Sequence, residues 1–210
     1  MIHDLDDAKK HSSEPVTFKL FMARHFLEKI PKKMPESDIG RMTLEANIDS
    51  FLFFASSVID VIKREINDEF ELFDKENVFY IHGLRKHLSD SGKQKKVKKI
   101  ISSYFTTPSK KRENTWDTKQ SSLWRLQILR NKVTHGHILK PRNIDALCIT
   151  YSVSQYRKIG DTNFVFEENA KNPHAYFAQI FADLHDFVKK THGVIPTKSR
   201  RKDSARVRTK

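Results

Sequence analysis

The sequence predicts an all-α protein: an antiparallel helical bundle with one small β-hairpin inserted before the last helix. Three observations support this class. Apolar side chains recur every three or four residues over most of the chain, which is the period of an amphipathic helix. Fifteen Phe against six Gly and seven Pro favour long helices with few turns. Near residue 149 the apolar period changes to two, which is typical of strands.

The N-terminal half of the chain predicts two helices. The first is expected over residues 16–30, where apolar residues repeat at helical spacing and Pro31 prevents continuation. A longer helix is expected from about Glu36 to Asn67. Its apolar stripe consists of Leu44, Ile48, Phe51, Leu52, Ala55, Ile59, Ile62 and Ile66. A polar row runs beside the stripe and consists of Glu45, Asp49, Ser56, Asp60 and Asn67. We interpret this row as facing water, with the border of a binding site as the alternative.

The middle of the chain predicts three further helices. Two shorter ones are expected over residues 77–90 and 94–105, followed by a polar loop over residues 106–117. The third is expected from about Thr118 to Thr134. It should end there because Gly136 suits a left-handed cap after a helix.

The C-terminal part predicts the hairpin and the last helix. The hairpin is expected at about residues 147–168, where apolar and polar residues alternate. The last helix is expected over residues 173–191. We expect one helical domain over residues 15–195, a flexible leader over residues 1–14, and a disordered basic tail over residues 196–210.

The formal net charge of the chain is +13, and much of this charge is clustered. Clustered Lys and Arg favour polyanionic partners, RNA above all, because they neutralise backbone phosphates. The residues expected to bind nucleic acid are Lys93, Lys95, Lys96, Lys98, Lys99, Lys110, Lys111 and Arg112. Two alternatives stay open for these clusters: plain solubility, and contact with an acidic membrane surface, for which no anchoring signal accompanies them.

The single cysteine and the short apolar runs indicate the cellular compartment of the protein. Cys148 is the only cysteine, so neither an intrachain disulfide nor a cysteine zinc site is possible. The acidic first residues lack the apolar run of a signal peptide, and the densest apolar stretch, residues 51–58, is too short to span a membrane. We therefore expect a cytoplasmic protein without membrane contact.

The C-terminal end of the helix expected over residues 118–134, with the residues directly after it, contains an unusual concentration of residues suited to catalysis. Arg130, Asn131, His135 and His137 fall within about two turns of one another. Histidine suits proton transfer because its ordinary pKa of about 6.5 lies near working pH. Arginine suits a phosphate because its planar fork donates two hydrogen bonds and keeps its charge. An asparagine beside it can orient the substrate. These residue types favour RNA cleavage without a metal.

The spacing of the arginine and the histidine poses a geometric problem. Five residues are a rotation of about 140°, so Arg130 and His135 would not share a face of a straight helix. Either the chain turns back at Gly136, or two copies of the helix meet and each site is built from both chains. The interface of such a dimer should use apolar residues outside the core, with Phe53, Phe54 and Trp124 as candidates.

The segment Arg130-Asn131-Lys-Val-Thr-His135 resembles the Arg-x4-6-His motif of HEPN (higher eukaryote and prokaryote nucleotide-binding) domains. The resemblance covers roughly residues 41–190 and includes the helical bundle with its motif at the end of a late helix. Many HEPN domains are metal-independent endoribonucleases of toxin–antitoxin, phage-defence and RNA-processing systems. The resemblance implies that Arg130 and His135 are catalytic and Asn131 supporting. The reserve candidates are His137, Glu45 and Asp49.

The same resemblance implies RNA as substrate, a homodimer, a cognate antitoxin or regulatory protein as a further partner, and no cofactor or metal. Two alternative functions stay open: a non-catalytic RNA- or nucleotide-binding module, and a helical interaction protein. The pair His135-Gly136-His137 could also bind a metal, although the spacing places no third ligand. The purely structural alternatives are a histidine at a helix end for His135 and a surface salt bridge for Arg130.

Overall fold

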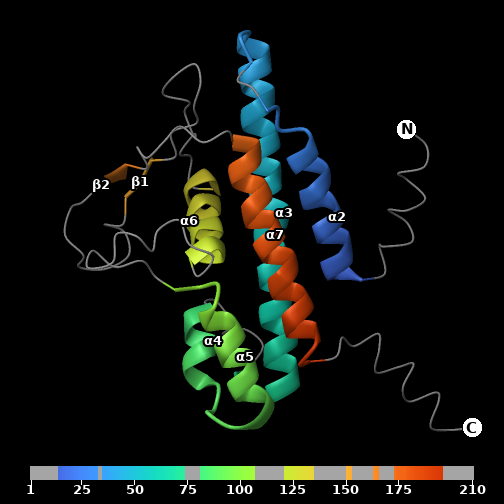
Figure 1. The fold of residues 1–210 in the computed structure, drawn as a ribbon, viewed down its shortest axis with the longest axis vertical. Coiled ribbons are helices and arrows are strands. Elements are labelled where there is room, and N and C mark those ends of the chain that lie inside the picture. The colour runs from blue at the N-terminus through green and yellow to red at the C-terminus, as the bar shows by residue number, and fades with distance from the viewer. Residues whose placement is uncertain are drawn as a thin grey trace, which may run out of the picture. The chain divides into compact units, whose positions relative to one another are not determined.

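The computed structural model describes residues 14–32, 35–73, 81–106, 121–134, 150–152, 163–165 and 173–195. These residues are mostly helical, as the predicted all-α class requires. The helices in chain order are α2 (Pro15–Glu28), α3 (Asp38–Phe70), α4 (Ile81–His87), α5 (Gly92–Ser102), α6 (Ser122–Thr134) and α7 (Pro173–His192) (Figure 1). No helix in this described part is both long and apolar enough to cross a bilayer.

Two three-residue strands, β1 (Thr150–Ser152) and β2 (Asn163–Val165), pair antiparallel, with Tyr151 opposite Phe164. Both fall within the segment where a hairpin is expected. The residues that would join and extend them lie outside the described ranges, so the hairpin as a whole stays a prediction. The expected basic tail also lies outside the described residues, as does all of the expected leader except Glu14.

The chain divides into two compact units. We call residues 22–56 and 125–181 the motif unit, because it contains the Arg-x4-His segment. We call residues 1–21, 57–124 and 182–210 the lysine unit, because it contains the lysines of α5. The helices α2, α3, α6 and α7 each contribute residues to both units. The single domain expected from the sequence stays a prediction.

The core of the motif unit is built on the N-terminal half of α3. The hydroxyl of Ser37 accepts a hydrogen bond from the amide of Gly40 (3.1 Å) and thereby caps the start of the helix. Phe51 contacts Phe177 of α7, with ring centres 5.3 Å apart. Further buried apolar side chains of this unit are Leu44, Ile48, Leu52, Ala55, Leu126, Leu129 and Ile180. The predicted apolar stripe of α3 is therefore its buried face.

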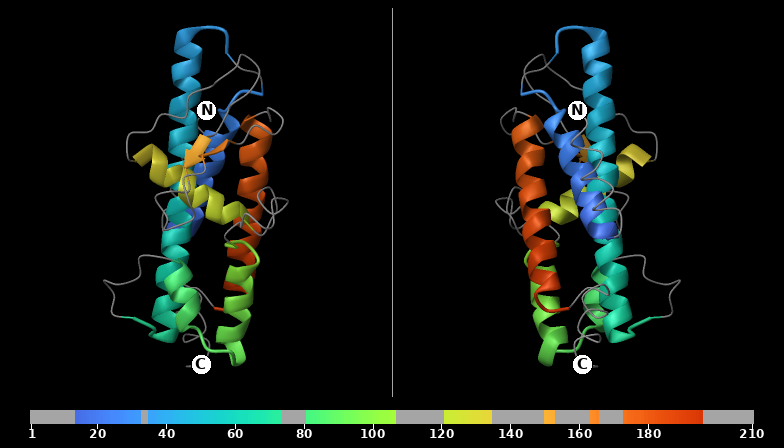
Figure 2. Two further views of the ribbon diagram at one scale, coloured as in Figure 1. Left: turned by 90° about the vertical axis from the view of Figure 1, so that its left-hand side faces the viewer. Right: turned by 90° about the vertical axis from the view of Figure 1, so that its right-hand side faces the viewer.

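The lysine unit packs α4 and α5 beside the C-terminal parts of α3 and α7 (Figure 2). Tyr104 and Phe105, which follow α5, are fully buried and lie edge-on to Phe187, with ring centres 5.7 and 5.4 Å away. The hydroxyl of Tyr104 donates to the carboxylate of Asp186 (2.7 Å) and accepts from Lys190 (3.1 Å). A buried ring is thus tied through its hydroxyl to a more exposed ion pair.

A buried side chain holds the turn that ends α3. Glu71 adopts a left-handed conformation with φ of 49°. The side-chain amide of Asn67 donates to the carbonyl of Phe73 (3.0 Å) and accepts from its N–H (2.9 Å). Asn67 is 4% exposed and Ser56 is 5% exposed. The interpretation of the polar row as facing water is therefore wrong for these two residues.

Candidate functional site

The first two residues of the motif lie in the last two turns of α6, as the sequence predicts. Arg130 and Asn131 are half-buried, and Nη1 of Arg130 donates to Oδ1 of Asn131 over 3.2 Å. The asparagine thus helps to orient the guanidinium beside it. His135 and His137 lie outside the described residues. So do residues 118–120, where the helix was expected to begin; α6 begins at Ser122.

The reserve acidic candidates Glu45 and Asp49 stand one turn apart on α3, in the same unit as Arg130 and Asn131. Partial burial raises the pKa of Asp49 above its ordinary value, and the neighbouring Glu45 carboxylate raises it further. Both causes disfavour the charged form of Asp49. Such shifts are found at functional carboxyl groups, and structural charge clusters produce them as well.

The motif unit also contains a buried arginine that the sequence analysis missed. Arg125 is 3% exposed, its Nη1 donates to the hydroxyl of Tyr176 (3.2 Å), and its guanidinium carbon lies 5.3 Å from the ring centre. Burial raises the pKa of Tyr176, while the charge and the hydrogen bond of Arg125 oppose that rise. The phenol therefore stays neutral at physiological pH. The available signal was an arginine enclosed by Leu123, Trp124 and Leu126 in an apolar run.

The lysines expected to bind nucleic acid differ in their surroundings. Lys95, Lys96 and Lys99 are exposed on α5. Lys93 lies 3.9 Å from the carboxylate of Glu69. Lys98 is half-buried and donates two hydrogen bonds, to the carbonyl of Leu88 and to the carboxylate of Asp90. The remaining candidates, Lys110, Lys111 and Arg112, lie outside the described residues.

Within the described part of the chain, no three His, Cys, Asp or Glu side chains gather closely enough to hold a metal ion. No protein-family model, no curated protein and no solved structure matches the chain. Function must therefore be inferred from the chemistry of the residues themselves.

Proposed function

We propose that the chain is a metal-independent endoribonuclease of the HEPN type that acts on RNA as a homodimer. The observation that carries the proposal is the contact between Arg130 and Asn131 at the end of α6, a few residues before His135. An arginine oriented by a neighbouring amide is a preorganised ligand for a phosphate, because its charge is permanent and its donors lie in one plane. The resemblance assigns such an enzyme to toxin, defence or RNA-processing systems.

In the proposed reaction the 2′-oxygen of a ribose attacks the adjacent phosphorus, and the bond from phosphorus to the 5′-oxygen of the next nucleotide breaks. His135 accepts the proton of the 2′-hydroxyl, and a second group donates a proton to the departing 5′-oxygen. Arg130 stabilises the negative charge that develops on the phosphoryl oxygens. The products are a 2′,3′-cyclic phosphate and a 5′-hydroxyl.

The proton donor has three candidates: His137, the His135 of a second copy, and Asp49. Asp49 belongs to the motif unit, and its raised pKa favours the protonated form that an acid requires. Of the two acidic candidates, we therefore prefer Asp49 to Glu45.

An exposed stripe on α3 supports the homodimer. Ile39, Met42 and Phe53 are 78%, 69% and 53% exposed, which is unusual for large apolar side chains. With Ala46 and Asp49 they follow the alternating spacing of three and four residues that forms the seam between two paired helices. Because Asp49 stands in this stripe, pairing of two α3 helices would bring the acidic candidate to the dimer interface.

The exposed stripe on α3 changes which residues are candidates for the dimer interface. Trp124 is 7% exposed and so has little surface to offer a partner. Phe54 is half-buried and stacks on Phe26, with ring centres 5.7 Å apart. Of the three interface residues predicted from the sequence, Phe53 is the one with most of its surface exposed, and Ile39 and Met42 join it.

The test is cleavage of a mixture of RNAs by the purified protein in EDTA. The double variant Arg130→Ala/His135→Ala should lose about 10²–10⁴-fold in cleavage rate, because a positioned acid or base contributes that much. Arg64→Ala/His185→Ala is the matched control, since it removes the same residue types from exposed positions outside the motif. The control should cleave like the wild type and leave 2′,3′-cyclic phosphate ends.

Two results would overturn the proposal. Equal trace cleavage by wild type, motif variant and control would eliminate the enzyme and leave a non-catalytic RNA-binding module. Loss of wild-type cleavage on chelation would point instead to a metal held by the two histidines that flank Gly136.

A further inference from the structure

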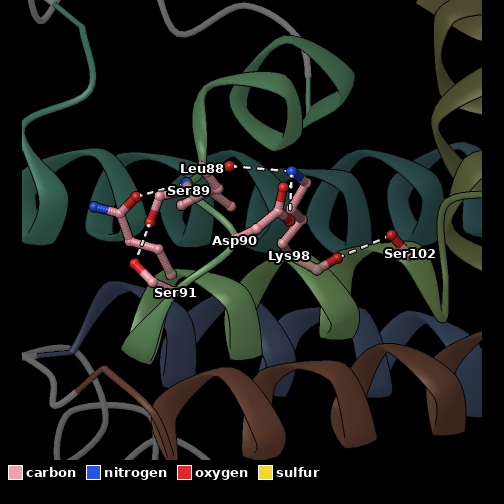
Figure 3. A network of polar contacts seen from close by, with 7 residues as sticks. Leu88, Ser89, Asp90, Ser91, Lys98 and Ser102 are labelled. Atoms are coloured by element: carbon pink, nitrogen blue, oxygen red, sulfur yellow. Dashed lines mark hydrogen bonds and ion pairs between the residues drawn. The ribbon is translucent and has the colours of Figure 1, made fainter.

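The α4–α5 connection fixes one lysine of α5, Lys98 (Figure 3). Other lysines of the same helix are exposed. Lys98 reaches back to the carbonyl of Leu88 (3.2 Å) and to Asp90 (3.0 Å), while the Ser102 hydroxyl donates to the Lys98 carbonyl (2.9 Å). The backbone N–H of Ser89 donates to the side chain of Gln94 (2.8 Å), so a second bond closes the same connection. The orientation of α5 on α4 is therefore held by side chains of α5 itself.

The exposed lysines share one face of this helix. At 100° per residue, Lys95, Lys96 and Lys99 fall within an arc of about 100°, opposite the fully buried Val97 and Ile101. Lys93 lies outside the arc. No ion pair joins any of the three to another residue in the described part of the chain. We call these three side chains the α5 lysine face.

The α5 lysine face is locally unfavourable. Lys95 and Lys96 stand near the start of α5, which has no acidic residue in its first turn, although the positive end of a helix dipole favours acidic side chains there. Lys99 lies in the last turn, where the same dipole favours a basic side chain. Lys99 follows Lys95 by four residues and Lys96 by three, so three like charges are neighbours on the helix surface. Sequences depart from local preferences mainly at functional places, and a bound polyanion would remove both sources of repulsion.

We infer that the α5 lysine face binds the phosphate backbone of single-stranded RNA. Its three charges match a polyanion, and lysine contacts to phosphates position a nucleic acid without reading its sequence. A membrane surface fits less well, because an interfacial helix needs an apolar face and α5 has turned Val97 and Ile101 into the core. The choice of RNA as the polyanion rests on the proposed function, but the binding does not require cleavage.

The experiment measures affinity for a single-stranded 2′-O-methyl RNA at several salt concentrations. This RNA lacks the attacking 2′-hydroxyl and cannot be cleaved, so the experiment measures binding whether or not the catalytic motif is active. Each neutralised phosphate contributes a slope of about −0.7 to the dependence of log affinity on log salt. The triple variant Lys95→Gln/Lys96→Gln/Lys99→Gln should therefore lose about 2 from the magnitude of the wild-type slope.

The matched control is Lys29→Gln/Lys32→Gln/Lys189→Gln, which removes three charges from exposed lysines outside α5. It should keep most of the wild-type slope. Lys98→Met is a second control. It should lower the unfolding temperature, because Lys98 holds the α4–α5 connection, and it should change the salt slope less than the triple variant does. Equal loss of slope in both triple variants would show that net charge alone holds the RNA, and would overturn the inference. The inference would also be overturned if the wild-type protein did not bind the RNA but bound anionic vesicles or acidic peptides through α5.

Discussion

Arg125 donates from Nη1 to the hydroxyl of Tyr176 over 3.2 Å, and its guanidinium carbon lies 5.3 Å from the centre of the same ring. The pair joins α6 to α7 inside the motif unit. Because α6 also carries Arg130 and Asn131, the pair helps to fix the helix from which the proposed catalytic groups extend. We assign Arg125 and Tyr176 a positioning role.

The first prediction tests this pair. Tyr176→Phe removes a hydrogen-bond acceptor from a buried cation, so we expect the free energy of unfolding to fall by about 1–3 kcal/mol. Arg125→Met combined with Tyr176→Phe should recover part of that loss, because the buried cation that lost the Tyr176 hydroxyl is removed as well. Urea unfolding of the wild type, both single variants and the double variant gives the coupling energy. A coupling energy of zero would contradict the assigned role.

The second prediction concerns the pH dependence of Asp49. Its pKa is raised by partial burial and by Glu45, so the charged form costs stability in the folded protein. That cost is absent below the unfolded value near 3.8 and is fully present once the pH exceeds the folded value. Asp49→Asn should therefore raise the unfolding temperature at pH 7, and the gain should disappear as the pH falls towards 3.8.

A control on the same helix should change in the opposite direction. Asp38 pairs with Arg41 in the first turn of α3, so Asp38→Asn should lower the unfolding temperature at neutral pH. If Asp49 also serves the reaction, Asp49→Asn will cleave RNA more slowly although it is the more stable protein. A stabilised variant with unchanged cleavage would remove Asp49 from the proposed site and leave the pH argument intact.

The elements that the sequence predicts well are those whose burial repeats locally. The apolar stripe predicted for α3, from Leu44 to Ile66, is buried, because an amphipathic pattern determines which face of a helix packs into the core. Arg125 and Asn67 were not predicted as buried, because each depends on a partner that the helical period does not reveal. Arg125 donates to Tyr176, which lies on another helix, and Asn67 bonds to the backbone of a turn.

Of the candidate site, local periodicity predicts only the part that lies on the helix. The helix places Arg130 and Asn131 in its last two turns because the apolar run before them continues to Leu129. On a straight helix His135 would be rotated by about 140° from Arg130. Its actual position depends on the path of the chain after Thr134, which local periodicity does not determine. The α5 lysines were predicted as one cluster, and only the packing of α5 distinguishes the structural Lys98 from the exposed ones.

The third prediction concerns the turn after α3. Asn67→Ala removes both side-chain hydrogen bonds to Phe73 and leaves backbone groups without their present partners, so we expect a loss of about 2 kcal/mol in the free energy of unfolding. Asn47→Ala is the matched control, because its single bond to the carbonyl of Lys29 is longer (3.3 Å) and exposed. It should cost less than about 0.5 kcal/mol. Equal losses would show that the Asn67 contacts contribute nothing specific.

The fourth prediction concerns the shared site. If each site needs motifs from two chains, mixing the wild type with an excess of His135→Ala should lower the activity per wild-type chain, because most wild-type subunits then sit in mixed dimers. Phe53→Glu should convert the dimer to a monomer without unfolding it, because that side chain is already 53% exposed. His185→Glu, which adds the same charge at an exposed position on α7, is the control and should remain dimeric.

Light scattering and cleavage measured on the same samples distinguish the two geometries. In the shared-site geometry the Phe53→Glu monomer is inactive, and its activity returns at protein concentrations high enough to restore pairing. A wild-type monomer with full activity would contradict the shared site. The chain would then have to turn back at Gly136 and bring His135 to Arg130 within one molecule. That geometry keeps the same proton transfers, but the active site then no longer requires a second chain.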